Sequence, residues 1–305
     1  MRHDAPGERS NVRDGEGPGK SKRSGAKVGT PASPERRRLL RRAAVGAAVA
    51  LGGGAAIARG NRLDVHAPPP SPGSGRASAP LRVALLTDVH APHDWFDFAD
   101  LVAATRAFDP HLVLVVGDAI NRRGDEALVR AYEALPARLG KFSTLGNWEY
   151  QGRCDFSRLR TEYDRAGVRL LVNEVATVDH DGEPIRLVGL DDFLHGRPAV
   201  DLTAAAPTAT GSDAAPRTLL LAHCPELFDH AARRSTAPFT ALAGHTHGGQ
   251  IAPFGRAILT PPGSGAYVKG WYERAGHRLY VSRGLGNSDI PFRIGSPPEL
   301  ALLTL

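Results

Sequence analysis

The sequence predicts an α/β protein, because strands and helices alternate through its first half and polar residues follow the strands. Apolar runs with the length of buried strands lie at residues 81–86, 112–116 and 142–145. Helical spacing of apolar residues follows each run, at residues 96–108, 125–135 and 156–166. Repeats of this length favour parallel strands, with functional groups at the carboxyl ends of those strands.

The second half of the chain changes to strands joined by short turns. The apolar runs there lie at residues 175–178, 185–190, 218–222, 239–243, 279–282 and 300–305. Residues 203–215 are rich in Ala, Thr, Pro and Ser, and we expect a surface insertion without chemistry there. Residues 81–305 are therefore predicted to form one domain.

The positive charge of the chain lies in its N-terminal segment. The net charge is +6, but residues 1–62 hold 14 Lys and Arg against 5 Asp and Glu. The remainder is slightly acidic, so the predicted domain has no basic bias and no nucleic-acid partner is expected. The two cysteines, Cys154 and Cys224, are too few for a disulfide framework, and either one bridge or two thiols is open.

The first 80 residues are predicted to direct the protein out of the cytoplasm. Residues 1–34 have the composition of a disordered basic tail, and Pro-rich residues 59–80 that of a linker. Between them, at residues 35–58, Arg36 and Arg37 precede an apolar run that is too short for a typical membrane span of roughly 20 residues. This pattern resembles a twin-arginine signal, so we expect the twin-arginine translocon as a partner and the periplasm or cell envelope as the location. An uncleaved anchor on a membrane surface and a cytosolic protein with a basic tail are the alternatives.

Five of the apolar runs end in side chains that can bind metal ions. These side chains are Asp88, His90, Asp118, Asn147, His223, His245 and His247. Each one alone is more often a turn or a core residue, but together and in this order they favour a metal site. Oxygen and nitrogen ligands without thiolate suit manganese, iron or zinc, and seven are more than one tetrahedral zinc needs. Two ions sharing one carboxylate fit this number, and Asp118 in the middle strand is the natural bridge.

These residues resemble the five sequence blocks of the calcineurin-like metallophosphoesterases. The blocks here are Asp88-x-His90, Gly117-Asp118, Gly146-Asn147, His223 and Gly244-His245-Thr246-His247. Gly248-Gly249-Gln250 and the C-terminal stretch are similar to the exported bacterial YkuE-like branch. The resemblance implies a four-layer α/β/β/α sandwich with two mixed sheets, the metallo-dependent phosphatase fold. It also implies one metal at Asp88, His90, Asp118 and His247, and another at Asp118, Asn147, His223 and His245.

The activity expected from this site is hydrolysis of a phosphoester by a hydroxide that bridges two divalent metal ions. No protein nucleophile is apparent. A small phosphorylated or lipid-linked phosphate compound outside the cytoplasm, as a diester or a monoester, is the expected substrate. One alternative is a pyrophosphatase acting on a nucleotide-linked lipid, similar to the UDP-diacylglucosamine hydrolases. Another is a metal-binding module with weakened catalysis.

The third block departs from the pattern of the family. Relatives carry Gly-Asn-His followed by an acid, and this chain has Trp148 in place of the histidine. An imidazole there can protonate the leaving oxygen, so its loss favours diesters, anhydrides and aryl phosphates. His93 could replace the lost imidazole or be an exposed loop residue, and Trp148 could bind substrate or fill the core. Gly248 and Gln250 are further candidates for contact with substrate.

Overall fold

The computed structural model describes residues 63–69, 79–91, 96–121, 126–203, 217–288 and 290–305. They belong to one compact unit of the chain, Pro31–Leu305. The expected basic tail, the export signal, His93 and nearly all of the 203–215 insertion lie outside the described residues.

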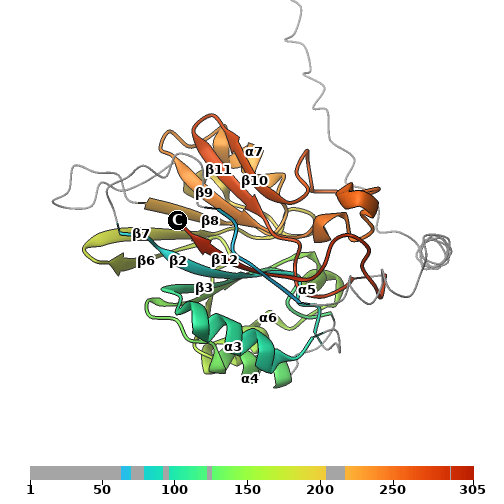
Figure 1. Ribbon diagram of the computed structural model, residues 1–305. Coiled ribbons are helices and arrows are strands. Elements are labelled where there is room, and N and C mark those ends of the chain that lie inside the picture. Colours follow the sequence, from blue (N-terminus) through green and yellow to red (C-terminus); the bar gives the residue numbers. More distant parts are fainter. Residues whose placement is uncertain (1–62, 70–78, 92–95, 122–125, 204–216, 289) are drawn as a thin grey trace, which may run out of the picture. The chain divides into compact units, whose positions relative to one another are not determined.

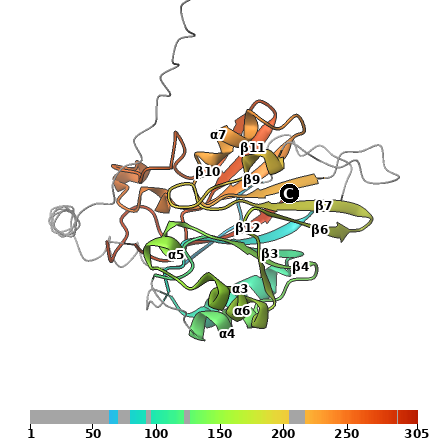
Figure 2. The ribbon, with the colours of Figure 1, turned by 180° about the vertical axis from the view of Figure 1, so that it is seen from behind.

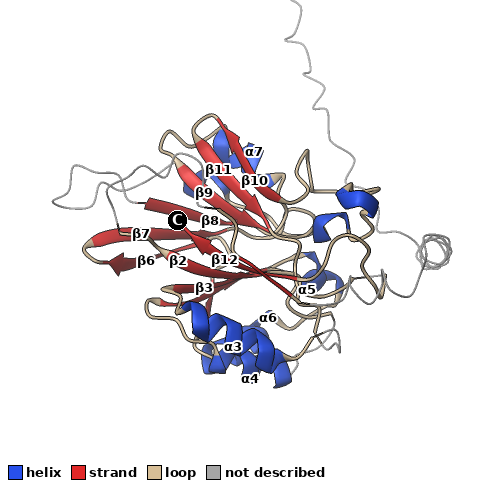
Figure 3. Cartoon of the chain, in the orientation of Figure 1, coloured by secondary structure: helices blue, strands red, loops and turns tan. Residues whose placement is uncertain are grey.

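The first of two six-stranded sheets carries the strands predicted in the first half of the chain (Figures 1 and 3). Its strand order is β1 (Asp64–His66), β12 (Glu299–Thr304), β2 (Arg82–Leu86), β3 (Leu112–Val116), β4 (Gly140–Thr144) and β5 (Val168–Leu170). Strands β2 to β5 are parallel, as the strand–helix repeats predict. The sheet is mixed because β12 runs antiparallel to β2 and parallel to β1.

Except for β12, which lies in the first sheet, the second sheet contains the strands of the second half. Its order is β10 (Gly270–Arg274), β11 (His277–Val281), β9 (Phe239–Ala243), β8 (Arg217–Leu221), β7 (Glu183–Gly189) and β6 (Glu174–His180). The four inner strands are parallel, and β10 and β6 add antiparallel edges. The antiparallel edge strands explain the short turns in this half, since antiparallel neighbours need no crossover helix.

Helices cover the outer faces of both sheets (Figure 2). Helices α3 (Phe98–Phe108), α4 (Glu126–Ala134) and α6 (Phe156–Arg165) pack on the first sheet, and α7 (Leu227–Ala232) packs on the second. A third apolar cluster joins the inner faces of the two sheets. The four-layer α/β/β/α sandwich implied by the resemblance is therefore confirmed.

Alternation along β2 shows how one strand serves two of these cores. Val83 and Leu85 face the other sheet, and Ala84 and Leu86 face the helices, because successive side chains point to opposite faces of a strand. All four are fully buried. Strands buried on both faces have continuous apolar sequences, which is why these runs were recognisable.

Several element boundaries differ from the sequence prediction, and some short elements were not predicted. Helix α3 begins at Phe98 and not at Phe96, because the Asp97 side chain accepts a hydrogen bond from Ala99 N and caps the helix. Strand β1 lies within the segment expected to be a linker and pairs with β12. The strands β5 and β10 and the helices α5 (Asn147–Gln151) and α7 were not predicted. Both cysteines are free thiols, and no helix in the described ranges is long and apolar enough to cross a membrane.

Candidate metal centre

The loops that follow five strands bring the predicted ligands together from both sheets. Asp88 and His90 follow β2, Asp118 follows β3, and Asn147 begins helix α5 after β4. His223 follows β8, and His245 and His247 follow β9 in the second sheet. Six of these side chains form two groups whose ligand atoms lie within 4.8 Å of one another: Asp88, His90 and His247, and Asp118, His223 and His245. All seven are buried.

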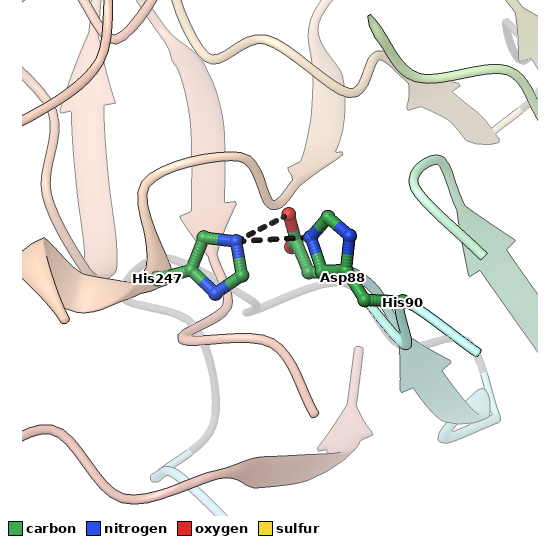
Figure 4. A group of neighbouring side chains, drawn as sticks. All are labelled: Asp88, His90 and His247. Carbon is green, nitrogen blue, oxygen red and sulfur yellow. Dashed lines mark hydrogen bonds and ion pairs between the residues drawn. The ribbon is translucent and has the colours of Figure 1, made fainter. Parts of the chain in front are cut away.

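The first group joins the turn after β9 to the turn after β2 (Figure 4). His247 Nε2 lies 3.2 Å from His90 Nε2 and 3.5 Å from Asp88 Oδ1. The His90 ring is oriented by Asn121, whose amide nitrogen donates to the His90 carbonyl at 2.8 Å. Asn121 Oδ1 then faces His90 Nδ1 at 2.9 Å and can only accept, so the lone pair of His90 lies on Nε2, toward the group.

Backbone carbonyls fix the two histidines of the second group in the same way. His223 Nδ1 donates to Val116 O at 3.0 Å, and His245 Nε2 donates to Pro262 O at 2.7 Å. Because a carbonyl only accepts, the nitrogens left to bind a cation are His223 Nε2 and His245 Nδ1. His223 Nε2 lies 3.1 Å from Asp118 Oδ2.

Asp118 lies between the two groups. Its Oδ2 faces His223 of the second group and, at 3.8 Å, His90 Nε2 of the first. Its Oδ1 accepts a hydrogen bond from the backbone N–H of Trp148 at 2.8 Å. One carboxylate thus borders both groups while its other oxygen is held by the start of α5.

Two buried polar atoms test whether this cluster fits metal ions. Asn147 Oδ1 has no hydrogen-bond partner in the described part of the chain, and neither has His223 Nε2 despite its short distance to Asp118. Leaving a buried polar atom unpaired is costly, so such atoms need an explanation. Both atoms are predicted ligand atoms, and a cation bound by them would satisfy both. The donor set therefore fits the metal ions that the sequence implies.

The backbone of the ligand-bearing turns adopts an uncommon conformation. Five of the seven predicted ligands have φ between 50° and 72°: Asp88, His90, Asp118, His245 and His247. Positive φ is rare for residues other than glycine and is concentrated at functional sites. Backbone hydrogen bonds between the turns hold this conformation, including Asp88 N to Gly117 O at 3.0 Å and His90 N to Asp118 O at 2.9 Å.

Two glycines of the sequence blocks permit a close approach of backbone to carboxylate. A Cβ on Gly244 would lie 2.2 Å from Asp88 Oδ2, and a Cβ on Gly146 would lie 2.3 Å from Asp118 Oδ1. Neither distance is possible for a real side chain, so only glycine fits at these positions. The glycines of these blocks therefore serve the placement of the carboxylates.

The charges of the cluster shift its acid–base equilibria in opposite directions. Burial acts to raise the pKa of Asp88, but His247, His223 and His90 together outweigh burial and hold the pKa at about 2. Burial acts to lower the pKa of His223, but Asp118 and Asp88 raise it to about 10. Burial lowers the pKa of His245 to about 4 and that of His247 to about 3. The carboxylates thus supply negative charge that a cation can neutralise.

Glu149 and Arg293 support the ligands and were not predicted as site residues. The buried carboxylate of Glu149 accepts hydrogen bonds from the backbone N–H groups of Ala119 and Gly146, both at 2.8 Å, and from that of Asp118 at 3.1 Å. It therefore ties the turn after β3 to the turn after β4. Glu149 could have been found from the sequence, because it is the acid that ends the third sequence block.

The guanidinium of Arg293 is fully buried and lies 3.0 Å from His247 Nδ1. It also donates to the carbonyls of Arg283 at 2.8 Å and Ser296 at 3.2 Å. Because a guanidinium has only donors, His247 Nδ1 accepts this bond and the ring proton lies on Nε2, toward the first group. Binding of a cation by His247 Nε2 would therefore require the proton to move to Nδ1 and the contact with Arg293 to open. No sequence pattern marks Arg293.

The residues predicted to contact substrate have different surroundings. Trp148 is half-buried, and its ring packs edge-on against His90 with centroids 5.4 Å apart, which places it beside the first group. Gln250 is buried, and its amide donates to Phe292 O at 3.1 Å, so this side chain bonds the C-terminal loop. A Cβ on Gly248 would lie 2.4 Å from Ser296 Oγ.

Comparison with known proteins assigns the chain to a family. The model of the calcineurin-like phosphoesterases matches residues 81–249, which is more than half of the chain. The chain belongs to this family, and it is a metal-dependent phosphoesterase.

Among its relatives, an uncharacterized metallophosphoesterase of Bacillus subtilis, YkuE, is 30% identical over 239 residues, which cover 74% of this chain and 79% of YkuE. The YkuE-like assignment is thus confirmed. A bovine transmembrane protein with a metallophosphoesterase domain is 32% identical over 264 residues, which cover 80% of this chain and 55% of that protein. Among solved structures, a phosphopantetheinyl hydrolase of Mycobacterium tuberculosis aligns with a TM-score of 0.39 and 14% identity, covering 67% of this chain and 89% of that one.

Proposed function

We propose that this protein hydrolyses phosphoesters with two divalent cations that share Asp118. Asp88, His90 and His247 would hold one cation with Asp118, and Asn147, His223 and His245 would hold the other with it. The observation that carries this proposal is Asp118 Oδ2, which faces histidines of both groups. Two such cations would activate water and stabilise the negative charge of the phosphoryl group.

The protein's own contribution is to orient the ligands. Asn121, Val116 O and Pro262 O fix three imidazole rings so that one ring nitrogen of each is directed into the cluster. The Trp148 N–H and the Glu149 carboxylate hold the turns that carry Asp118 and Asn147. Imidazole, amide and carboxylate donors together suit manganese, iron or zinc.

Metal content tests the proposal directly. Protein reconstituted with Mn²⁺ and freed of unbound metal is expected to hold two ions per chain, because the ligands form two groups. His247→Ala is expected to hold fewer, and His230→Ala, on helix α7, is the matched control that keeps two. Elemental analysis measures the ratio, and a firm ceiling of one ion in the wild-type protein would contradict the two-cation site.

We propose phosphodiesters and aryl phosphates as the better substrates, in preference to alkyl monoesters. Support comes from Trp148, which stands beside His90 where relatives have an imidazole. An alkyl leaving group needs a proton from the protein, and an indole ring does not supply it. A small phosphorylated or lipid-linked phosphate compound remains the proposed substrate class.

Trp148→His is expected to raise kcat/KM for an alkyl monoester relative to an aryl diester. General acid catalysis contributes roughly 10²–10⁴-fold, and the gain should fall below this range because no neighbour has been selected to orient the new ring. Trp148→Phe is the matched control, since it removes the indole without adding an acid. Steady-state kinetics on both substrates decides the matter: equal changes for both would show that Trp148 acts by packing alone.

We also propose that the protein is exported by the twin-arginine route, on the basis of residues 35–58. Changing both Arg36 and Arg37 to Lys should retain the protein in the cytoplasm, because the translocon reads the paired arginines. Fractionation followed by immunoblotting measures this, with Arg41→Lys and Arg42→Lys together as the control. Unchanged export of the Arg36 and Arg37 variant would show that another route carries the protein.

A further inference from the structure

An exposed apolar loop lies directly beside the metal centre. Four large hydrophobic residues in the described part of the chain are exposed, and three of them are in one segment: Phe254 (98% exposed), Ile258 (66%) and Leu259 (68%). We call residues 251–262 the apolar loop. Apolar side chains that stay exposed to water raise the free energy of the folded protein relative to one in which they are buried. Their concentration in one place therefore marks an interaction surface.

Both ends of the apolar loop are joined to residues of the metal centre. It begins at Ile251, immediately after the turn that carries His247, and it ends at Pro262, whose carbonyl accepts the hydrogen bond of the His245 ring at 2.7 Å. Its middle also packs on that turn, because a Cβ on Gly249 would lie 2.3 Å from the Cβ of Ala257. A surface held by this loop would therefore lie next to the cluster.

The conformation of the loop keeps its apolar side chains in solvent. Phe254 has a φ of 55°, and a short turn over Pro253–Gly255 is closed by a hydrogen bond from Gly255 N to Ala252 O at 2.9 Å. Ile258 N donates to Ile251 O at 3.3 Å, and this bond holds the two sides of the loop together at its base. These side chains thus project from a closed loop into solvent.

The charged residues within the apolar loop and the segment that follows it have one sign. No Asp or Glu occurs between Gly248 and Tyr272, whereas Arg256 lies between the exposed apolar residues. The ammonium of Lys269 lies near the tip, since a Cβ on Gly255 would be 4.0 Å from its Nζ. Apolar side chains flanked by cations match a bilayer with anionic headgroups, because the apolar groups enter the acyl boundary and the cations contact the headgroups.

We propose that the apolar loop inserts into the surface of an anionic lipid bilayer and holds the metal centre at that surface. A bilayer needs no matching pocket, which suits side chains that project singly from a loop. This inference goes beyond the proposed phosphoesterase activity, since the loop supplies none of the proposed ligands. A substrate anchored in lipid would then meet the site without leaving the bilayer.

A site-specific probe in the full chain tests the insertion separately from any binding by residues 1–62. A nitrobenzoxadiazole fluorophore is attached to Ile258→Cys in a Cys154→Ser background; Cys224 is fully buried and stays unlabelled. Vesicles of phosphatidylcholine and phosphatidylglycerol carry nitroxide-labelled acyl chains. The matched control carries the same probe at Glu133→Cys, an exposed position on α4.

We expect the probe at residue 258 to shift to shorter wavelength and to be quenched by the nitroxide lipids, with no quenching at residue 133. Replacing Phe254, Ile258 and Leu259 by Ser together should weaken vesicle insertion at least about tenfold, because their transfer from water is lost. Hydrolysis of a soluble aryl diester should stay unchanged in that variant.

Three results would overturn the proposal. One is vesicle-bound protein whose probe at residue 258 is not quenched. Another is a blue shift without vesicles that grows with protein concentration, which would assign the loop to a contact with a second copy. The third is a blue shift without vesicles that is independent of concentration and is lost when the apolar run at residues 43–58 is replaced by a Gly/Ser sequence, which would assign the loop to that run.

Discussion

Asp118→Asn is expected to lower kcat/KM at least about a thousandfold, a loss of roughly 4 kcal/mol of transition-state stabilisation. In the wild-type protein one carboxylate oxygen accepts from the Trp148 N–H and the other faces His223 and His90. If the amide oxygen keeps the bond to Trp148, its NH₂ group replaces the oxygen that faces both histidines. An NH₂ group is a donor and cannot bind a cation, so the change removes a shared ligand and a negative charge together.

Kinetics on an aryl diester at saturating Mn²⁺, together with the metal content, measures this effect. Asp181→Asn is the matched control, because the side chain of Asp181 is 75% exposed. This variant should retain wild-type activity. If Asp118→Asn kept more than about a tenth of the activity, a loss of only about 1.4 kcal/mol, Asp118 would not be the shared ligand.

Gly244→Ala is expected to lower kcat/KM about a hundredfold or more, although it adds only one methyl group. The new Cβ would lie 2.2 Å from Asp88 Oδ2 and 2.6 Å from Thr87 Cβ, so Asp88 must move. Asp88 also accepts the backbone N–H of His245 at 3.0 Å, and a shift of the carboxylate therefore disturbs a ligand from each sheet. Misplacement of a catalytic group by about 1 Å can cost about 10²-fold in rate.

A fall in the activity of Gly244→Ala could come from a less stable fold or from displacement of Asp88, and the two causes must be separated. Gly182→Ala is the control, because a Cβ there meets no atom within 4 Å and only its φ of 83° is unfavourable. It should cost about 1 kcal/mol of unfolding free energy and leave the activity intact. Denaturant unfolding and kinetics are measured on both variants, and near wild-type activity of Gly244→Ala would show that Asp88 has room to move.

The ligand-bearing strands could be predicted because of their burial. A parallel strand covered on both faces is a continuous apolar run, so its end is marked by an abrupt change to polar residues. That change occurs at Thr87-Asp88 after β2 and at Gly117-Asp118 after β3. Strand ends of one parallel sheet lie at one edge, and this predicted that Asp88 and Asp118 would be close together. His223, His245 and His247 come from the second sheet, which this rule does not cover.

Other parts of the fold and site carry no comparable signal. Strands β1 and β5 have three residues each, too few to show a period, and β10 is a half-exposed edge strand without an apolar run. Arg293 is fully buried, but its partners are carbonyl groups and a histidine distant in sequence. Which ring nitrogen of each histidine is free also depends on such contacts, so the tautomers could not be derived from the sequence.

The position of β12 has a consequence for the order in which the protein can be assembled. β12 pairs with β2, and Ala301 lies opposite Leu85, more than 200 residues earlier in the chain. While the ribosome adds the intervening residues, one edge of β2 has no native partner, and that strand is entirely apolar after Arg82. An unpaired apolar edge is a template for association with other chains, and contacts so distant in sequence form slowly. Nascent chains are therefore most exposed to aggregation before β12 is made, and a chaperone that shields residues 82–86 during synthesis would protect the strand that positions Asp88 and His90.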